Sequence, residues 1–223
     1  MRVDGRPVRY AVDAPRRVEQ SFLAYHKPGS SAVQREREES VEPDIPAPKR
    51  GRWVGIGSLE PSTTGLALLT TDGELANRLM RLGGAIEREY ALRFTGTPSA
   101  EQVERLLAGV ELDEGPAGIV ALEPSGGAGT NVWYRVVLRD GRYRALRAAC
   151  DAVGVVVNRV MLVRYGPVEL GRLHRDANRP LTPIEVNALY AAAGIPRNRE
   201  TRRAGARPGK TARPGRRRKS AAR

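Results

Sequence analysis

In this 223-residue sequence, the position of one carboxylate, that of Glu60, makes it a candidate for catalysis. Glu60 lies in VGIGSLEPSTTGLALLTTDGELANRL, Val54 to Leu79, at the seam between an apolar run and a turn rich in Pro, Ser, Thr and Gly. A glutamate that only solvates the turn beside Pro61 is one interpretation. A functional carboxylate placed at the end of an apolar element is the other, and the surrounding sequence has to decide between them.

Metal and disulfide chemistry is not expected. Cys150 is the only cysteine, so it has no disulfide partner within the chain. His26 and His174 are the only histidines, and together with one cysteine they do not make a zinc-binding pattern. The sequence therefore predicts no metal site.

The net charge of +13 is concentrated in one segment. From Arg197 to Arg223 there are twelve Lys or Arg and one acid, Glu200, so this tail carries +11 and residues 1 to 196 carry +2. Such a segment has too few apolar side chains to offset its ordering entropy, and we expect it to be disordered. A mobile polycation binds phosphate and releases counterions, so nucleic acid is the expected partner, with Arg216, Arg217 and Arg218 as candidate contacts. The alternative is a solubilising extension.

The rest of the composition is that of a globular chain. With 40% apolar residues it can bury an ordinary core, and no apolar run approaches the roughly 18 residues of a membrane span. The start, MRVDGRPVRYAVDAPRR, lacks the apolar region of a secretory signal. We expect a cytoplasmic protein that does not enter membranes.

Local patterns place the elements. Capping boxes at Thr71 to Glu74, Ser99 to Gln102 and Thr182 to Glu185 predict three helix starts. A fourth helix is expected from Arg142 to Val153, before Gly154. Strands are predicted for four runs rich in β-branched and aromatic residues: REYALRFTG, AGIVALEP, NVWYRVVLR and VVVNRVMLVRYG. The second and third of these read as a hairpin joined by SGGAGT. This order favours an α+β fold with a largely antiparallel sheet.

With these elements placed, the chain resembles the ribosomal-RNA pseudouridine synthases of the type that modifies small- and large-subunit rRNA. The resemblance runs from about Phe22 to about Ala192, through LAYHKP, GSLEPSTTGLALLTTDGELANRLM, EREYALRF, GVELDEGPAG, GTNVWYRVVLRDGRYRALRAACDAVG and NRVMLVRYGPVELG. It implies a curved mixed sheet with a central cleft that accepts a uridine flipped out of RNA. The cleft would detach the base and rejoin it to the ribose through carbon, without a cofactor or metal.

The resemblance also gives Glu60 a role. The family has an aspartate there, after Gly-Arg-Leu, as its catalytic residue, whereas this chain reads Gly57, Ser58, Leu59, Glu60. Both polar members of the motif are therefore altered. Detaching a base from ribose needs a carboxylate as nucleophile or base, and a misplacement of about 1 Å can cost on the order of 100-fold. The resemblance thus implies a catalytic Glu60 whose added methylene lowers turnover.

Further site residues follow from the same blocks. Tyr90 matches a tyrosine that stacks on the target base, or it is a core aromatic on the strand face of Leu92 and Phe94. Arg147 matches the basic residue that pairs with the catalytic carboxylate, or it is an exposed helix arginine, and the neighbouring Ala148 replaces a basic residue common in the family. Leu162 would floor the pocket, or it is ordinary sheet core. The remaining substrate and RNA candidates in these blocks are Ser58, Thr64, Arg142 and Arg144.

The expected organisation has three parts: a remnant of an N-terminal RNA-binding domain (1–21), a catalytic domain (22–196) and the disordered basic tail (197–223). The sequence leaves three functions open. The leading expectation is a pseudouridine synthase acting on rRNA as a monomer, which the retained Tyr90, Arg147 and TTGLALLTTDGELANRL favour. It could be a catalytically silent relative that binds rRNA or an assembling ribosome, which the altered GSLE favours. It could also be a basic scaffold with a vestigial cleft.

Overall fold

The computed structural model describes residues 2–3, 6–7, 20–29, 45–57, 63–82, 86–113, 115–139 and 143–196. Its main feature is a nine-stranded sheet in the order β11-β3-β5-β9-β6-β8-β7, with β4 beside β5 and β10 beside β9. The strands are β3 (Phe22–Lys27), β4 (Val54–Ile56), β5 (Thr64–Thr70), β6 (Arg88–Thr95), β7 (Ile119–Ala128), β8 (Asn131–Leu138), β9 (Val157–Tyr165), β10 (Val168–Glu169) and β11 (Asn178–Pro180). The helices of the described part are α2 (Gly73–Arg81), α3 (Ala100–Ala108), α4 (Tyr143–Ala152) and α5 (Pro183–Ala192). Apart from these, β1 (Arg2–Val3) and β2 (Arg6–Pro7) pair with each other.

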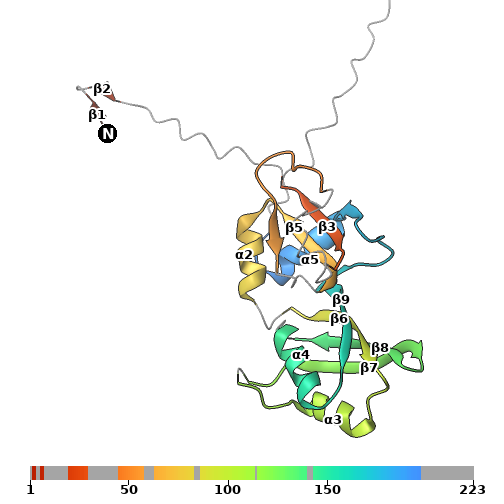
Figure 1. The fold of residues 1–223 in the computed structure, drawn as a ribbon. Helices are drawn as coiled ribbons and strands as arrows, with labels where there is room; N and C mark the ends of the chain where they lie inside the picture. The colour runs from red at the N-terminus through yellow and green to blue at the C-terminus, as the bar shows by residue number, and fades with distance from the viewer. Residues whose placement is uncertain are drawn as a thin grey trace, which may run out of the picture.

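The sheet runs through two lobes (Figure 1). The first lobe holds β3, β4, β5, β11, α2 and α5; the second holds β6, β7, β8, α3 and α4; β9 joins them. Between the lobes, β5 and β9 run parallel and pair at only two positions, Thr64 with Met161 and Gly65 with Leu162. The other pairings in this sheet are antiparallel. The expected α+β fold with a mixed, largely antiparallel sheet is confirmed.

Gly65 permits the close approach of β5 to β9. Its φ is +104°, a region that side-chain-bearing residues avoid. A Cβ at this position would lie 2.2 Å from the carbonyl oxygen of Leu162 and 2.8 Å from its backbone nitrogen. The seam between the lobes therefore requires a residue without a side chain.

Two of the three predicted helix starts are confirmed. Ser99 with Gln102 and Thr182 with Glu185 form complete capping boxes at α3 and α5. The prediction at Thr71 is wrong, because the N-cap of α2 is Asp72, whose side chain accepts the Leu75 N–H. The Thr71 hydroxyl instead accepts the Ser21 N–H at 2.9 Å and so joins α2 to the chain before β3.

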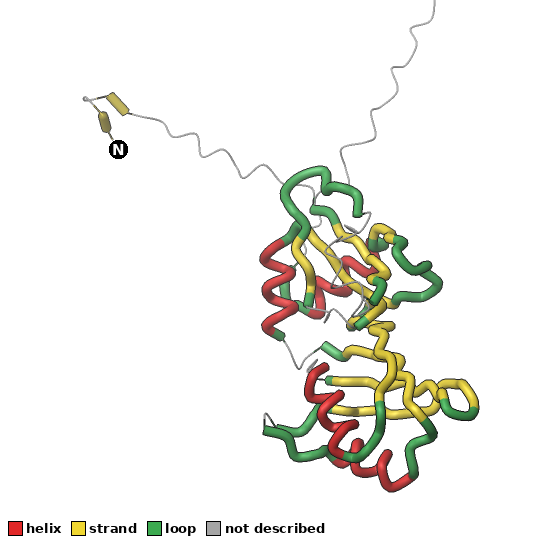
Figure 2. Tube along the Cα trace, viewed as in Figure 1, coloured by secondary structure: helices red, strands yellow, loops and turns green. Residues whose placement is uncertain are grey.

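The four predicted strands are present as β6 to β9, and β7 and β8 form the predicted hairpin (Figure 2). The hairpin is longer than expected, since the glycines of SGGAGT continue β7 as far as Ala128. Burial alternates along β6, where Tyr90, Leu92 and Phe94 all face the core. β3, β5 and β11 were not predicted, although β5 lies at the centre of the first lobe.

The first lobe is completed by the C-terminal part of the described chain. β11 pairs with β3, across about 150 positions of sequence, as in the pair Asn178 and Tyr25. From α5, the Tyr190 hydroxyl bonds to the carboxylate of Asp72 and to the amide oxygen of Gln20, each at 2.5 Å. In the described ranges, no helix combines the length and apolar character needed to cross a membrane.

Candidate active site

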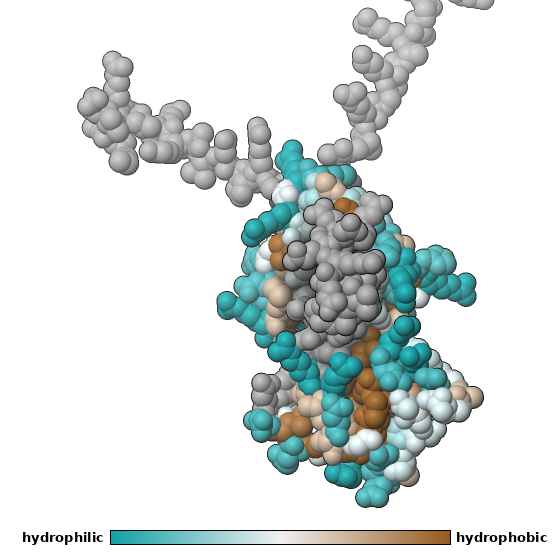
Figure 3. Space-filling view, viewed as in Figure 1, coloured by the Kyte–Doolittle hydropathy of each residue, from teal (hydrophilic) through white to brown (hydrophobic). Residues whose placement is uncertain are grey.

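A cavity of about 130 Å³ lies where the two lobes meet. Strands of both lobes line it, together with the residue that follows β4. Its lining residues are Lys27, Gly55, Ile56, Gly57, Leu66, Ala67, Leu68, Leu69, Arg88, Tyr90, Leu162 and Tyr165. On the face in Figure 3, a strip of apolar side chains lies over the second lobe, flanked by hydrophilic ones. The cavity lining itself combines mainly apolar residues with the cations Lys27 and Arg88.

A β-bulge shapes the floor of this cavity. Tyr90 pairs with Leu162 while Glu89 pairs with Arg164, so Val163 is an extra residue on β9. Residues three apart on a regular strand face opposite sides of a sheet. The extra residue at Val163 therefore lets both Leu162 and Tyr165 face the cavity beneath Tyr90.

Two cations and no acid stand among the described lining residues. The Arg88 guanidinium lies over the Tyr165 ring, 5.1 Å from its centroid, which favours the cation through the ring quadrupole. Lys27 Nζ donates to the Thr63 carbonyl at 3.1 Å, and burial lowers the pKa of this lysine. The cavity is therefore suited to an electron-rich or anionic group.

The opposite face of β6 carries an ion-pair network that joins β6 to β8 and β9. Glu89 lies 2.9 Å from Arg135 Nε and 3.2 Å from Arg164 Nε. Burial alone would raise the pKa of Glu89, but the hydrogen bonds and positive charges of Arg135 and Arg164 lower it overall. Because Glu89 pairs with both arginines, its role is structural: it fixes the strands that position the site.

Two predicted site residues come together. Tyr90 and Leu162 are neighbours across β6 and β9, both are buried, and both line the cavity. Tyr90 is also part of the hydrophobic core, so the core interpretation and the cavity interpretation hold at once.

Other predicted residues lie elsewhere. Thr64 is at the lobe seam, and its hydroxyl donates to the Val160 carbonyl at 3.2 Å. Arg147 on α4 is half-buried and donates to the Val157 carbonyl at 3.3 Å, and it does not line the cavity. Arg144, also on α4, is exposed.

The remaining predicted positions lie outside the described residues. They are Ser58, Glu60, Arg142, Arg216, Arg217 and Arg218. The described residues on either side of 58–62 both lie at the cavity: Gly57 lines it, and Thr63 accepts the hydrogen bond of Lys27. The expected meeting of Glu60 with Tyr90 and Arg147 stays a prediction.

Sequence comparison supplies the context for this geometry. Three curated relatives carry the name ribosomal large subunit pseudouridine synthase B. The Pseudomonas aeruginosa protein is 40% identical over 200 residues, covering 86% of this chain and 51% of the relative. The Salmonella typhimurium protein is 40% identical over 178 residues, with 78% and 61% covered. The Escherichia coli K12 protein is 39% identical over 202 residues, with 88% and 68% covered.

The chain belongs to the ribosomal large subunit pseudouridine synthase B family. It spans about half to two thirds of the length of these family members. A search with protein-family models gave no match. Among solved structures, one described as a crystal structure of pseudouridylate synthase superposes with a TM-score of 0.58 at 21% identity, covering 77% of this chain and 74% of that one. That likeness concerns the fold.

Three residues of the cavity, Lys27, Arg88 and Tyr165, were not predicted from the sequence. Arg88 and Tyr90 are two apart on a strand, so strand alternation alone places them on one face. Tyr165 has no such signal, because its orientation depends on the bulge at Val163. Lys27 was missed because β3 was not predicted.

Cys150 is not suited to act as a catalytic nucleophile. It is buried on α4, and burial raises the pKa of its thiol to about 12, with a contribution from the charge of Asp151. A thiol with so high a pKa carries almost no thiolate at neutral pH. Within the described ranges, no three His, Cys, Asp or Glu side chains are grouped as metal ligands would be.

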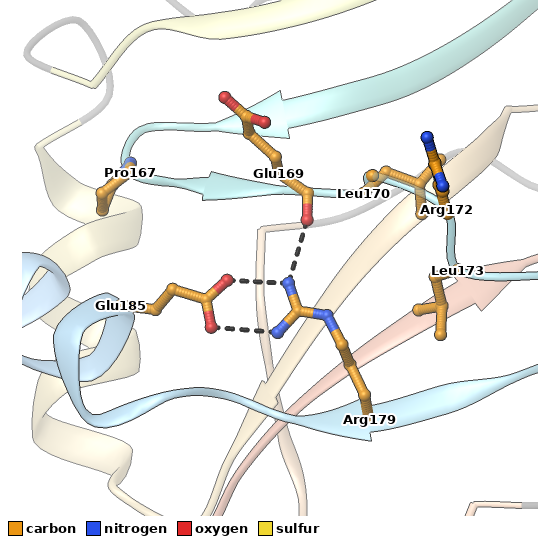
Figure 4. Close-up of a pocket in the computed structure, with 8 residues that line it drawn as sticks. Pro167, Glu169, Leu170, Arg172, Leu173, Arg179 and Glu185 are labelled. Atoms are coloured by element: carbon orange, nitrogen blue, oxygen red, sulfur yellow. Dashed lines mark hydrogen bonds and ion pairs between the residues drawn. The ribbon is translucent and has the colours of Figure 1, made fainter.

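A larger open groove, of about 560 Å³, lies beside β10 and α5 (Figure 4). Two cations line it, Arg172 and Arg179. Arg179 binds Glu185 in a bidentate pair at 2.7 and 2.9 Å and also donates to the Glu169 carbonyl at 3.1 Å. The hydrogen bonds from Arg179 are the main reason that the pKa of Glu185 falls to about 2. Because Arg179 and Glu185 satisfy each other, this pair is structural, and the smaller cavity, which Tyr90 and Leu162 line, is the candidate active site.

Proposed function

We propose that the chain isomerises uridine to pseudouridine in structured ribosomal RNA, without a cofactor. In this reaction the bond from ribose C1′ to N1 of uracil breaks and a bond from C1′ to C5 forms. The C5 proton is lost and N1 gains one, so the atoms balance. The observation that supports this proposal is the cavity between the lobes, where Tyr90 and Leu162 meet, in a chain of the pseudouridine synthase B family.

Tyr90 and Leu162 hold the base in this proposal. A tyrosine ring offers about 1 to 3 kcal/mol of stacking per base, and Leu162 closes the floor beneath it. A base taken out of the RNA stack loses its former neighbours, and these contacts replace them. The apolar lining also excludes water from the reacting bond.

Glu60 supplies the carboxylate in this proposal, as nucleophile or base at C1′. In the sequence, Glu60 follows the cavity residue Gly57 by three positions. Arg147 is proposed to hold this carboxylate ionised when RNA is bound, which requires its guanidinium to leave the Val157 carbonyl. Contacts to RNA are assigned to Ser58, Thr64, Arg142, Arg144, Arg216, Arg217 and Arg218.

The proposed organisation follows the sequence prediction. Residues 22–196 would form the catalytic domain, acting as a monomer in the cytoplasm. Residues 1–21 would be the end of an RNA-binding domain, and residues 197–223 would add nonspecific affinity for RNA.

The test is tritium release from deproteinised rRNA that contains 5-tritiated uridine, because each base rejoined through C5 loses its tritium. Carbodiimide-dependent reverse-transcription stops would then map the modified position. Release that depends on the protein, with one mapped stop, supports the proposal. Binding of rRNA with no tritium release would show the catalytically silent relative instead.

A further inference from the structure

Residues Gly171–Ala177, called the basic loop below, connect β10 to β11 and begin and end beside the cavity. At one end, the Leu170 N–H donates to the carbonyl of Val163, the bulge residue next to Leu162, at 2.8 Å. At the other end, the Asp176 N–H donates at 3.0 Å to His26, which precedes the cavity residue Lys27. The basic loop is therefore attached to two strands at positions adjacent to the cavity lining.

Side-chain contacts hold the basic loop in one conformation. His26 Nδ1 lies 2.8 Å from the Leu173 carbonyl, and the His26 N–H donates to Ala177 at 3.0 Å. Leu173 packs against the hydrophobic core. Asp176 has a φ of 62°, which is uncommon for a residue other than glycine, and its carboxylate accepts the Tyr25 hydroxyl at 2.9 Å. A loop fixed in this way loses little entropy when it binds a ligand.

The charge that the basic loop presents to solvent is positive. Arg172, His174 and Arg175 are exposed, and within the described part of the chain none of the three forms an ion pair. The single acid of the loop, Asp176, is also exposed and accepts the Tyr25 hydroxyl, so Arg172, Arg175 and Asp176 together carry a net charge of +1. Burial raises the pKa of Tyr25 to about 12, with the bond to Asp176 adding to the effect, so this hydroxyl stays a donor at neutral pH.

Nearby charges do not neutralise the loop. Arg179 and Glu185 pair with each other in the adjoining groove. Figure 4 shows the Arg172 side chain extending away from that pair. Two guanidinium groups therefore remain on a rigid support.

We propose that the basic loop binds backbone phosphates of the RNA that flank the target nucleotide. A seven-residue loop that leaves and re-enters the sheet projects at most about 12 Å, half its extended length. Phosphates along one strand of double-stranded DNA are about 3.4 Å apart along the axis, and a spacing of the same order in RNA brings nucleotides next to the flipped one within this reach. Structured RNA is recognised largely through such backbone contacts and shape. The inference rests on the proposed RNA substrate and adds a second contact surface outside the cavity.

The test compares the full-length chain with the variant R172Q/R175Q by measuring rRNA binding over a range of salt concentrations. Each lost phosphate contact lowers the slope of log K against log salt by about 0.7 to 0.9, so the slope should fall by about 1.4 to 1.8. Affinity near 0.15 M salt should fall roughly tenfold or more. In turnover assays KM should rise while kcat is unchanged, because the loop does not touch the reacting bond.

Two control variants separate the loop from general charge effects. R81Q/R105Q removes two exposed arginines from α2 and α3 and should leave the slope near that of the unaltered chain. R172K/R175K keeps the charge and should keep the slope, even if R172Q/R175Q is less stable. Equal slopes for R172Q/R175Q and R81Q/R105Q, or no rRNA binding by the unaltered chain, would overturn the proposal. The proposal would also be overturned if the full-length chain bound vesicles containing phosphatidylserine as strongly as rRNA and R172Q/R175Q weakened both equally. Salt-dependent binding through the loop without tritium release would reject the proposed catalysis and leave the loop assignment standing.

Discussion

Replacing Gly65 with alanine tests whether the seam between β5 and β9 holds the two lobes together. The alanine Cβ would lie 2.2 Å from the Leu162 carbonyl oxygen, so β5 and β9 would have to separate by most of an ångström. Overpacking of this kind costs about 1 to 3 kcal/mol, and a side-chain-bearing residue at a φ of +104° costs about as much again. Only two residue pairs join the strands here, so little remains to offset the strain.

We therefore expect Gly65→Ala to lower the free energy of unfolding by about 4 kcal/mol. For a chain of this size that corresponds to a fall in Tm of roughly 8 to 16 °C. The assay is urea unfolding followed by circular dichroism, together with a thermal melt. Gly73→Ala is the matched control, because nothing lies within 4 Å of a Cβ added there, and it should be neutral or stabilising by up to about 1 kcal/mol. Equal urea midpoints for the two variants would refute the reasoning about the seam.

Four further predictions concern the groove, the cavity and the tail. The folded-state pKa of Glu185 is about 2, below its ordinary 4.5. The stability that this carboxylate contributes is therefore present at neutral pH and is lost as pH falls from about 5 to 2. Glu185→Gln should remove that part of the pH dependence of the free energy of unfolding in urea titrations. Tyr90→Phe should keep the affinity for uridine-containing RNA, whereas Tyr90→Leu should weaken it by about 1 to 3 kcal/mol in filter-binding assays. Glu60→Asp should raise tritium release by at least about 100-fold with RNA affinity little changed, and ordinary turnover by the unaltered chain would contradict this. Truncation after Pro196 should flatten the salt dependence of RNA binding, while an unchanged slope would make the tail a solubility element.

The sequence predicts elements well where local chemistry alone decides them. Ser99 and Thr182 have a glutamine or glutamate three residues later and no competing partner, and both capping boxes form. Thr71 satisfies the same pattern, but its hydroxyl binds Ser21, 50 residues away in sequence, and Asp72 becomes the cap. A contact between distant segments cannot be read from a local pattern.

The candidate site shows the same division. Tyr90 and Leu162 were predicted as pocket residues through the family resemblance, and they meet across β6 and β9. Lys27 was not predicted, because it lies on β3, where burial on both faces masks the alternation of apolar and polar residues. Tyr165 was not predicted, because its orientation depends on the extra residue in β9. Arg147 was expected at the pocket, yet its helix directs it to the start of β9. Register and bulges arise from strand pairing, which is a property of the whole sheet.

The return of the C-terminal segment to the first lobe sets the order in which the chain can fold during synthesis. The second lobe uses one continuous stretch, from β6 to β9, and can pair its strands as soon as that stretch has left the ribosome. The first lobe begins earlier in the chain, yet β3 must wait for β11, and Asp72 must wait for Tyr190. Nascent chains usually fold from the N-terminal side, so here β3 keeps an unpaired edge until β11 has been made. Pulse proteolysis of stalled nascent chains should find the second lobe protected first, although the first lobe is made before it.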